Sequence, residues 1–263
     1  MEFSWKGKIV LLRGVADSDW IYSLIKKTGT FYEIDLLKYI HYAIGVERGC
    51  ILDVGANIGN HAVFFGLFIS DAVVCFEPNP KVFPILVENL SSNKINYKAF
   101  QLGLGDKESE AEIELPTSQE NNIGAARLVV NRGGNSIRVA TLDSLLPEIK
   151  AFMNGKKISA IKIDVEGMES HVLRGGKRTL EEYRPDLFVE IMNSDQMQKI
   201  EAEVVPMGYQ RIVSWAATPV WHFVHREKFR LMRQIQLATY NAYHKKYIVF
   251  AKLAYSRIKS IVS

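Results

Sequence analysis

A group of three acidic residues, Asp164, Glu166 and Glu169, stands directly after a short apolar run. Ligands of open α/β sheets bind outside the carboxyl ends of the strands, so Asp164 and Glu166 are expected to face a cleft. Three acids so close repel one another unless a cation, a basic partner or a substrate hydroxyl relieves the repulsion. Glu169 is expected to begin the next helix, where the dipole stabilises an acid. Asp164 and Glu166 are therefore the first candidates for a general base.

Two further residues extend this set of candidates. His61 titrates near neutral pH, which suits a general base, although a histidine at a helix start more often packs or shapes a cofactor site. Glu190, near the end of a later apolar run, either points into the same cleft or is structural. Asp164, Glu166 and Glu190 could together hold magnesium, since hard oxygen ligands suit this ion. Nothing in the sequence requires a divalent cation, so no metal ligand is assigned.

The segment Ile51–His61 has the pattern of a strand, a glycine turn and a helix start. Gly55 and Gly59 let the backbone approach a ligand closely, and the helix N-terminus beyond them favours a carboxylate or phosphate. Asn57 stands where the G-x-G-x-x-G pattern has its middle glycine, which makes room for a pyrophosphate. A pyrophosphate would therefore fit poorly, whereas an amino acid moiety with its own charges would fit.

Glu77 follows Asp53 by 24 residues and stands at the end of the next apolar run. A carboxylate there can accept hydrogen bonds from both ribose hydroxyls of an adenosine. After the third run, Leu104 and a glycine leave room for a ring, and Asp106 could meet the adenine amino group. These residues predict a cofactor that contains adenosine. Nicotinamide and methyl-donor cofactors both contain this group.

Short apolar runs alternate with helix-like segments, which is typical of a mainly parallel sheet covered on both faces. Helices are expected to begin near Asn60, Asn79 and Glu169. The long connection 105–159 is expected to contain a β excursion formed by segments 111–115 and 136–142, which flank the polar stretch 117–122 and a turn at 131–135. The last two strands should form an antiparallel hairpin. The predicted strands are 50–54, 72–76, 97–102, 160–165, 187–191, 209–214 and 221–225.

Charge is unevenly distributed along the 263 residues, whose net charge is +4. Residues 226–263 carry nine of the 33 basic residues and one of the 29 acids, which leaves 24 basic and 28 acidic residues before them. A nucleic-acid partner is therefore not expected. Apolar residues recur at helical spacing in this segment, which predicts a basic amphipathic tail that packs on its own domain, on a second subunit or on a membrane surface.

Three parts of the chain are predicted, namely an N-terminal extension at 1–30, a catalytic domain at 31–226 and the basic amphipathic helical tail at 227–263. Cys50 and Cys75 lie inside apolar runs and should be buried, free thiols, which fits a reducing compartment. No run approaches the roughly 18 apolar residues of a membrane span. We expect a cytoplasmic protein, with peripheral contact to a membrane as an option.

Five stretches in order resemble the FkbM family of S-adenosylmethionine-dependent methyltransferases, from about Phe31 to Arg226. They are DVGANIGNH at 53–61, FEPNP at 76–80, LGD at 104–106, TLDSL at 141–145 and KIDVEGMESHVLRGG at 162–176. The resemblance implies a Rossmann-like class I methyltransferase fold and methyl transfer to an oxygen, often on a sugar of a glycan, glycolipid or polyketide. The expected partner is therefore a carbohydrate or glycoconjugate acceptor.

The resemblance also implies which residues hold S-adenosyl-L-methionine. The methionine part is expected beside the glycine loop, the ribose at Glu77 and the adenine near Asp106, while Tyr32 and Glu33 close over the cofactor. The candidate cofactor-binding residues are Glu33, Asp53, Gly55, Asn57, Gly59, Asn60, Glu77, Asn79, Leu104, Asp106 and Asp164.

Two alternatives from other classes stay open. A nicotinamide-dependent oxidoreductase is disfavoured by Asn57 at the middle-glycine position and by the terminal hairpin. A glycan-binding or scaffold protein without turnover would keep the fold and use the tail. Trp215 and Trp221 could stack on a sugar ring, but near two strands they are more often core residues, so neither is assigned to the site.

Overall fold

A computed structural model describes residues 1–16, 19–45, 49–114, 127–130, 136–216, 219–230 and 233–244. Met1–His225 forms one compact unit and Arg226–Ser263 a second. Helical structure in the second unit covers residues 233–244. The rest of the tail predicted at 227–263, from 245 onward, lies outside the described residues. In the part of the chain that is described, no helix has the length and apolarity needed to cross a membrane.

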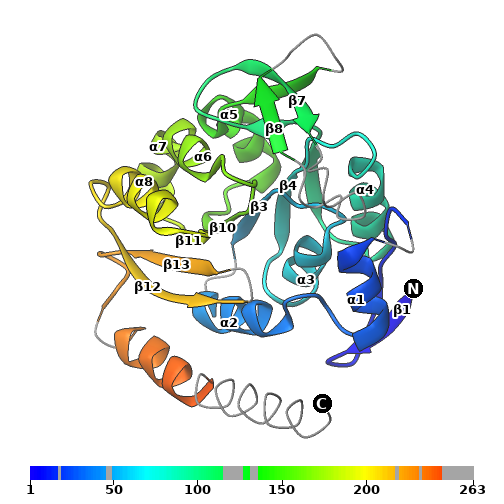
Figure 1. Ribbon diagram of the computed structural model, residues 1–263. Helices are drawn as coiled ribbons and strands as arrows, with labels where there is room; N and C mark the ends of the chain where they lie inside the picture. The colour runs from blue at the N-terminus through cyan, green and yellow to red at the C-terminus, as the bar shows by residue number, and fades with distance from the viewer. Residues whose placement is uncertain are drawn as a thin grey trace, which may run out of the picture. The chain divides into compact units, whose positions relative to one another are not determined.

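A seven-stranded sheet forms the centre of the first unit (Figure 1). Every neighbouring pair is parallel except those that involve the strand nearest the C-terminus, which runs antiparallel to both neighbours. This arrangement confirms the predicted parallel sheet with a terminal antiparallel hairpin. The order across the sheet is β12 (Tyr209–Trp215), β13 (Val220–His225), β11 (Asp186–Glu190), β10 (Ile158–Ile163), β3 (Cys50–Val54), β4 (Ala72–Phe76) and β5 (Tyr97–Phe100).

Helices cover both faces of this sheet, which is why the four central strands are buried at every position. One layer contains α2 (Ile34–Ile44), α3 (Asn60–Phe68) and α4 (Phe83–Ser92). The other contains α5 (Leu142–Met153), α6 (Glu169–Gly175), α7 (Lys177–Tyr183) and α8 (Ser194–Val204) (Figure 1). The predicted starts at Asn60 and Glu169 are confirmed.

The predicted helix start near Asn79 is wrong by four residues, because the Asn79 side chain organises a turn instead. Its Oδ1 accepts a hydrogen bond from the backbone N–H of Lys81 at 3.0 Å. Asparagine favours such turns over helix interiors because its side chain competes for backbone groups. The helix α4 therefore begins at Phe83, with Pro84 in its first turn.

The predicted β excursion is present as a four-stranded sheet. Segment 111–115 corresponds to β7, and segment 136–142 to β9, which ends earlier because Thr141 caps α5 by accepting a hydrogen bond from Ser144 N–H. β8 was not predicted. The polar stretch 117–122 and the turn at 131–135 lie outside the described residues. The order is β6 (Gly103–Leu104), β9 (Ile137–Ala140), β7 (Ser109–Glu114) and β8 (Arg127–Val130).

The N-terminal segment packs against α3 and α4. It forms a hairpin of β1 (Glu2–Trp5) and β2 (Lys8–Leu11), followed by α1 (Trp20–Thr28). Trp5 meets the rings of Phe64 and Phe68 of α3 at 5.1 and 4.7 Å between centroids. The Asn89 side chain of α4 accepts a hydrogen bond from Arg13 N–H at 2.8 Å and donates one to Ile58 O at 2.7 Å. These contacts tie the segment before α1 to the loop between β3 and α3.

Candidate functional site

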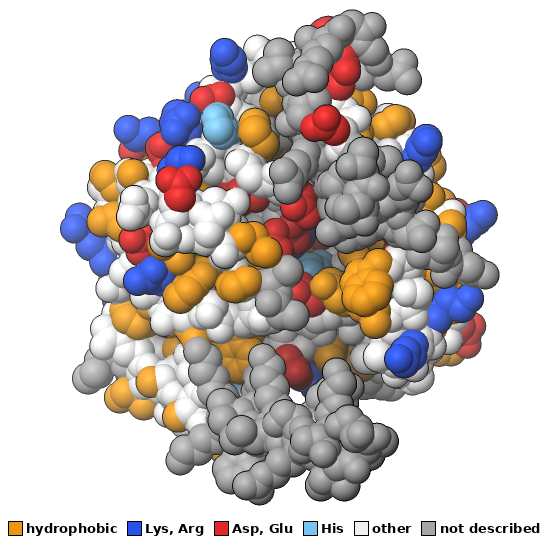
Figure 2. Space-filling view, viewed as in Figure 1, with side chains coloured by type: hydrophobic (Ala, Val, Ile, Leu, Met, Phe, Trp, Pro, Cys, Tyr) orange, Lys and Arg blue, Asp and Glu red, His pale blue; other side chains and the backbone are white. Residues whose placement is uncertain are grey.

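A cavity of about 260 Å³ opens at the carboxyl ends of β3, β4, β10 and β11. Parallel strands bring their carboxyl ends to one edge of the sheet, where the connecting loops leave a crevice. Figure 2 shows acidic side chains gathered in a hollow near the middle of this face, with hydrophobic side chains beside it. The loop after β3, the loop after β4 and the segment Asp164–Glu166 after β10 all contribute to the wall.

The loop between β3 and α3 is fixed by contacts that only glycine permits. A Cβ atom on Gly55 would lie 1.9 Å from the backbone oxygen of Asp164, and Gly55 has a φ of +77°. Gly59 has a φ of +87° and would place a Cβ 2.8 Å from Leu86 Cδ1. Asn57 also has a positive φ, of 50°, which asparagine tolerates better than most residues. The loop backbone therefore lies directly against the end of β10.

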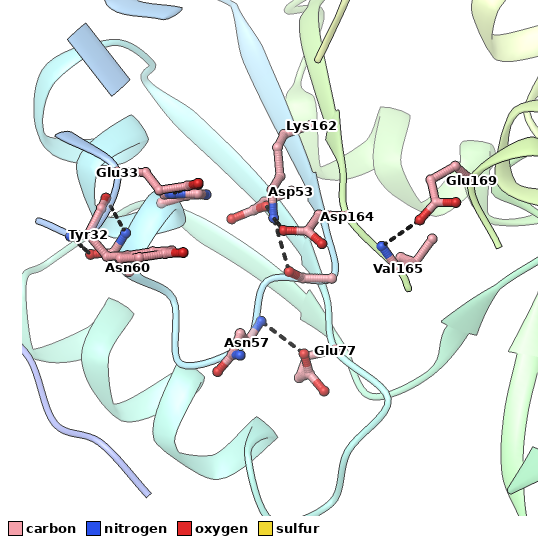
Figure 3. Close-up of polar contacts among 12 residues, drawn as sticks. Tyr32, Glu33, Asp53, Asn57, Asn60, Glu77, Lys162, Asp164, Val165 and Glu169 are labelled. Carbon is pink, nitrogen blue, oxygen red and sulfur yellow. Dashed lines mark hydrogen bonds and ion pairs between the residues drawn. The ribbon is translucent and has the colours of Figure 1, made fainter. Parts of the chain in front are cut away.

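The Glu77 carboxylate accepts hydrogen bonds from two backbone N–H groups, and Figure 3 shows the one from Asn57. Its Oε2 accepts a hydrogen bond from Asn57 N–H at 2.9 Å, and its Oε1 accepts one from Asn79 N–H at 2.8 Å. Burial raises the pKa of Glu77 to about 7, although both backbone N–H groups work in the opposite direction. Each oxygen keeps a second lone pair, so the carboxylate can accept two further hydrogen bonds from a vicinal diol.

Lys162 forms a buried ionic centre at the cavity wall. Its Nζ lies 3.2 Å from Asp164 Oδ2, 3.6 Å from Asp53 Oδ1 and 3.3 Å from the backbone oxygen of Gly55 (Figure 3). Burial alone would lower the Lys162 pKa, but the charges of Asp164 and Asp53 outweigh it and raise the pKa. Burial raises the pKa of Asp53 to about 6, against the pull of Lys162. The ammonium group thus joins β3 to β10.

Three carboxyl groups lie close together at the end of β10 and β11. Oxygens of Asp164, Glu166 and Glu190 lie within 4.8 Å of one another, a spacing that a divalent cation could bridge. Burial would raise the pKa of Asp164, but Lys162 and a hydrogen bond with Glu190 outweigh it and hold the pKa below its usual value. Asp164 is therefore ionised at neutral pH, and Lys162 already supplies it with a counter-charge.

The turn that follows β10 sets the direction of the Glu166 side chain. It has a φ of 53°, and the next residue, Gly167, has a φ of +104°. The buried Glu169 carboxylate fixes this turn by accepting hydrogen bonds from Val165 N–H at 3.3 Å and Gly167 N–H at 2.9 Å. The two predicted functions of the acidic segment are thus separate: Glu169 holds the turn, and Glu166 lines the cavity.

A second wall of the cavity is built by the segment before α2. Asn60 accepts a hydrogen bond from Tyr32 N–H at 3.0 Å and donates one to Tyr32 O at 3.1 Å. This double contact places Glu33, which has a φ of 52°, with Oε2 3.5 Å from His61 Nε2. Burial, followed by the charge of Lys162, lowers the pKa of His61 to about 3. The imidazole is therefore neutral at pH 7.

Most of the predicted site residues lie at the cavity wall, and a few do not. Asp53 is fully buried and contacts Lys162 below the wall, and Gly59 shapes the loop from behind. The Asp106 carboxylate does not line the cavity, since it lies 3.0 Å from Arg174 Nη1 of α6. Its adenine contact stays a prediction. The predicted residues that line the wall are Glu33, Gly55, Asn57, Asn60, His61, Glu77, Asn79, Leu104, Asp164 and Glu166.

Among the wall residues that sequence reasoning missed are Lys162, Trp20 and Ile21. Lys162 was readable in principle, because a lysine inside an otherwise apolar strand must have buried partners. Trp20 and Ile21 begin α1 and carry no local signal, because only the packing of the N-terminal segment brings them to the cavity. Trp215, weighed for sugar stacking, is instead buried and stacked on Tyr39 at 5.1 Å.

The strand order, the single antiparallel strand β13 and the glycine loop over β3 define a Rossmann-like class I methyltransferase fold. The model of the methyltransferase FkbM domain matches residues 53–235. The chain belongs to this family, which confirms the resemblance seen in the five sequence stretches.

Two curated relatives and one solved structure are similar to the chain. The hexuronic acid methyltransferase AglP of Haloferax volcanii is 31% identical over 135 residues, which are 51% of this chain and 53% of the relative. Methyltransferase 1 of Beauveria bassiana is 26% identical over 169 residues, 53% of this chain and 67% of that protein. The crystal structure of the FkbM methyltransferase from Methylobacillus flagellatus shares 15% identity and a TM-score of 0.48, covering 82% of this chain and 48% of that one. The chain thus matches about half the length of the Haloferax volcanii relative.

Proposed function

We propose that this methyltransferase uses S-adenosyl-L-methionine and methylates a hydroxyl group of a sugar in a glycan, glycolipid or related glycoconjugate. The observation that carries the cofactor is the clasped Glu77 beside the glycine loop. Support for a carbohydrate acceptor comes from the 31% identity to a hexuronic acid methyltransferase over half the chain.

The cavity residues fit this cofactor. The Glu77 carboxylate can accept hydrogen bonds from both ribose hydroxyls, and Leu102 and Leu104 provide an apolar wall for the adenine. Gly55 and Gly59 leave the loop backbone open for the amino acid part. Glu33 and Asp164 offer negative charge for its ammonium and sulfonium groups.

When bound, S-adenosyl-L-methionine supplies a methyl group already activated on a positive sulfur. What the chain must add is orientation of the acceptor hydroxyl and a group to take its proton. We assign the proton to the carboxylates of Asp164 and Glu166 at the cavity wall. His61 is neutral, with a pKa lowered to about 3, and we assign it to hydrogen bonding rather than to proton transfer.

The two alternative functions make less use of this site. Asn57 occupies the place where a dinucleotide site needs a glycine, so a pyrophosphate would meet its side chain. A scaffold protein without turnover would not need a buried lysine pairing Asp53 and Asp164 at the cavity wall. A tail that mediates dimerisation or contact with a membrane surface, and a location in the cytoplasm, complete the proposal.

The test is methyl transfer from S-adenosyl-L-methionine carrying a deuterated methyl group to a panel of methyl glycosides, followed by mass spectrometry. We expect a mass gain of one labelled methyl on an oxygen of at least one glycoside, lost in Glu77→Ala and kept in Glu181→Ala, an exposed acid of α7. Binding of the cofactor without transfer to any glycoside, together with transfer to a nitrogen or carbon acceptor, would overturn the proposed acceptor class.

A further inference from the structure

Trp20 stands at the rim of the cavity in an unusual setting for a tryptophan. It lines the cavity and yet is 55% exposed. It is the first residue of α1, and the buried Asp19 fixes this helix start by accepting a hydrogen bond from Tyr22 N–H at 2.9 Å. An exposed indole at a capped helix start offers a surface for stacking against the C–H face of a ring.

Polar groups suited to a hydroxylated ligand lie in the same cavity. His61 Nε2 is buried and makes no hydrogen bond among the described residues, since its contact with Glu33 Oε2 is 3.5 Å long, and the side chain lines the cavity. A buried nitrogen without a partner costs free energy unless a ligand or water satisfies it. Glu166 and Glu190 line the cavity as well and can accept hydrogen bonds from hydroxyl groups.

The charge of the wall selects among hydroxylated ligands. Five of the described lining residues are acids. Glu33, Glu77 and Asp164 are assigned above to the cofactor, and Lys162, the basic lining residue, is held by Asp53 and Asp164, which leaves Glu166 and Glu190 as the acids on the acceptor side. A carboxylate on the acceptor would meet this excess of negative charge inside a partly enclosed space, where repulsion is stronger than in water. A ring that carries hydroxyls and no negative charge avoids that cost.

We propose that Trp20, His61 and Glu166 form an acceptor subsite for an uncharged pyranoside, and that this chain discriminates against hexuronates, in contrast to the hexuronic acid methyltransferase to which it is 31% identical over about half its length. The proposal rests on the proposed function, which it refines by fixing the charge class of the acceptor. Trp20 lies before residues 53–235, so the acceptor wall includes a part of the chain that the family model does not cover.

The test compares methyl β-D-glucopyranoside with methyl β-D-glucopyranosiduronate, which differ only in the carboxylate at C6. Saturation-transfer NMR on the 263-residue chain with S-adenosylhomocysteine present gives a dissociation constant for each. We expect the neutral glycoside to bind about fivefold or more tightly than the uronate. Trp20→Ala should weaken its binding about two- to tenfold, and Trp20→Phe should keep most of it. Glu166→Gln should strengthen uronate binding by about threefold or more.

Three results would overturn the subsite. They are equal or tighter binding of the uronate, no Trp20-dependent signal from either glycoside, or a Trp20→Ala variant that loses S-adenosylhomocysteine while its glycoside binding is unchanged. Calorimetry of S-adenosylhomocysteine on wild type and Trp20→Ala separates this proposal from the proposed function. If wild type binds no S-adenosylhomocysteine, the proposed function fails first. If both proteins bind S-adenosylhomocysteine equally and Trp20→Ala leaves the glycoside signals unchanged, only the subsite proposal fails.

Discussion

The two halves of the cavity are built by different means. The half at β3 and β4 is made by backbone, with Gly55 pressed against the end of β10 and Glu77 held by two backbone N–H groups. The half at β10 and β11 is lined by side chains, among them Asp164, Glu166 and Glu190, and Trp20 of α1 adds to the cavity wall. A backbone-built half tolerates little change, whereas a side-chain-built half can vary from one relative to the next. The backbone-built half suits a cofactor that stays the same, and the side-chain-built half suits an acceptor that differs between relatives.

The largest expected effect comes from closing the backbone-built half. Gly55→Ala would place a methyl group 1.9 Å from Asp164 O. We expect a loss of more than about 4 kcal/mol in the free energy of unfolding, because neither backbone can move without opening the sheet. Gly155→Ala is the matched control, since its φ is +81° and no atom lies within 4 Å of the added Cβ. It should cost about 1 to 2 kcal/mol, from the left-handed backbone alone. Urea unfolding measures both, and equal losses would contradict the steric account.

The next largest effect is expected from Lys162, whose ion pairs connect the two halves of the cavity. Lys162→Met would leave Asp53 and Asp164 without their buried counter-charge. We expect a loss of about 3 kcal/mol in the free energy of unfolding, at the lower end for a broken buried ion pair. The loss is limited because Asp53, whose pKa is already raised to about 6, can become neutral by taking up a proton. Adding Asp53→Asn should recover part of the loss. Chemical denaturation of both variants checks this, and no recovery in the double variant would show that Lys162 acts through packing alone.

The pH dependence of cofactor binding sharpens the role of Glu77. With its pKa raised to about 7, the carboxyl is protonated at pH 6 and accepts ribose hydroxyls poorly. S-Adenosylhomocysteine affinity should therefore fall roughly tenfold from pH 8 to pH 6. The stability of the unliganded protein should change in the opposite direction. Because the pKa of Glu77 is raised in the folded protein, its contribution to the free energy of unfolding falls as pH rises from about 4.5 to about 7. Glu77→Gln should flatten the affinity profile, and an unchanged slope would assign it to another group.

The smallest expected effect concerns the acidic cluster in the side-chain-built half. Asp164, Glu166 and Glu190 lie close enough to hold a cation, but Lys162 already neutralises Asp164 at 3.2 Å. Treatment with EDTA should therefore change methyl transfer by less than about twofold. Activity that vanishes on chelation and returns with magnesium would instead make the cluster a metal site.

The same contrast explains how much the sequence alone could predict. Gly55 and Glu77 were found because a sharp turn and a strand end demand particular residue types at fixed spacing. The positions of Trp20 and Asp106 depend on tertiary packing. Gly175 lets α6 pack against the backbone of Gly105, where a Cβ would lie 1.9 Å from the oxygen, and this brings Arg174 to Asp106. No local pattern reveals that pairing, nor the packing that brings α1 to the cavity.

The most direct test of the central claim is a calorimetric titration of the chain with S-adenosyl-L-methionine and, separately, with NAD. We expect micromolar binding of S-adenosyl-L-methionine that collapses in Glu77→Ala, persists in Glu181→Ala, and has no counterpart for NAD. Binding of NAD alone, or of neither compound by a folded protein, would contradict it.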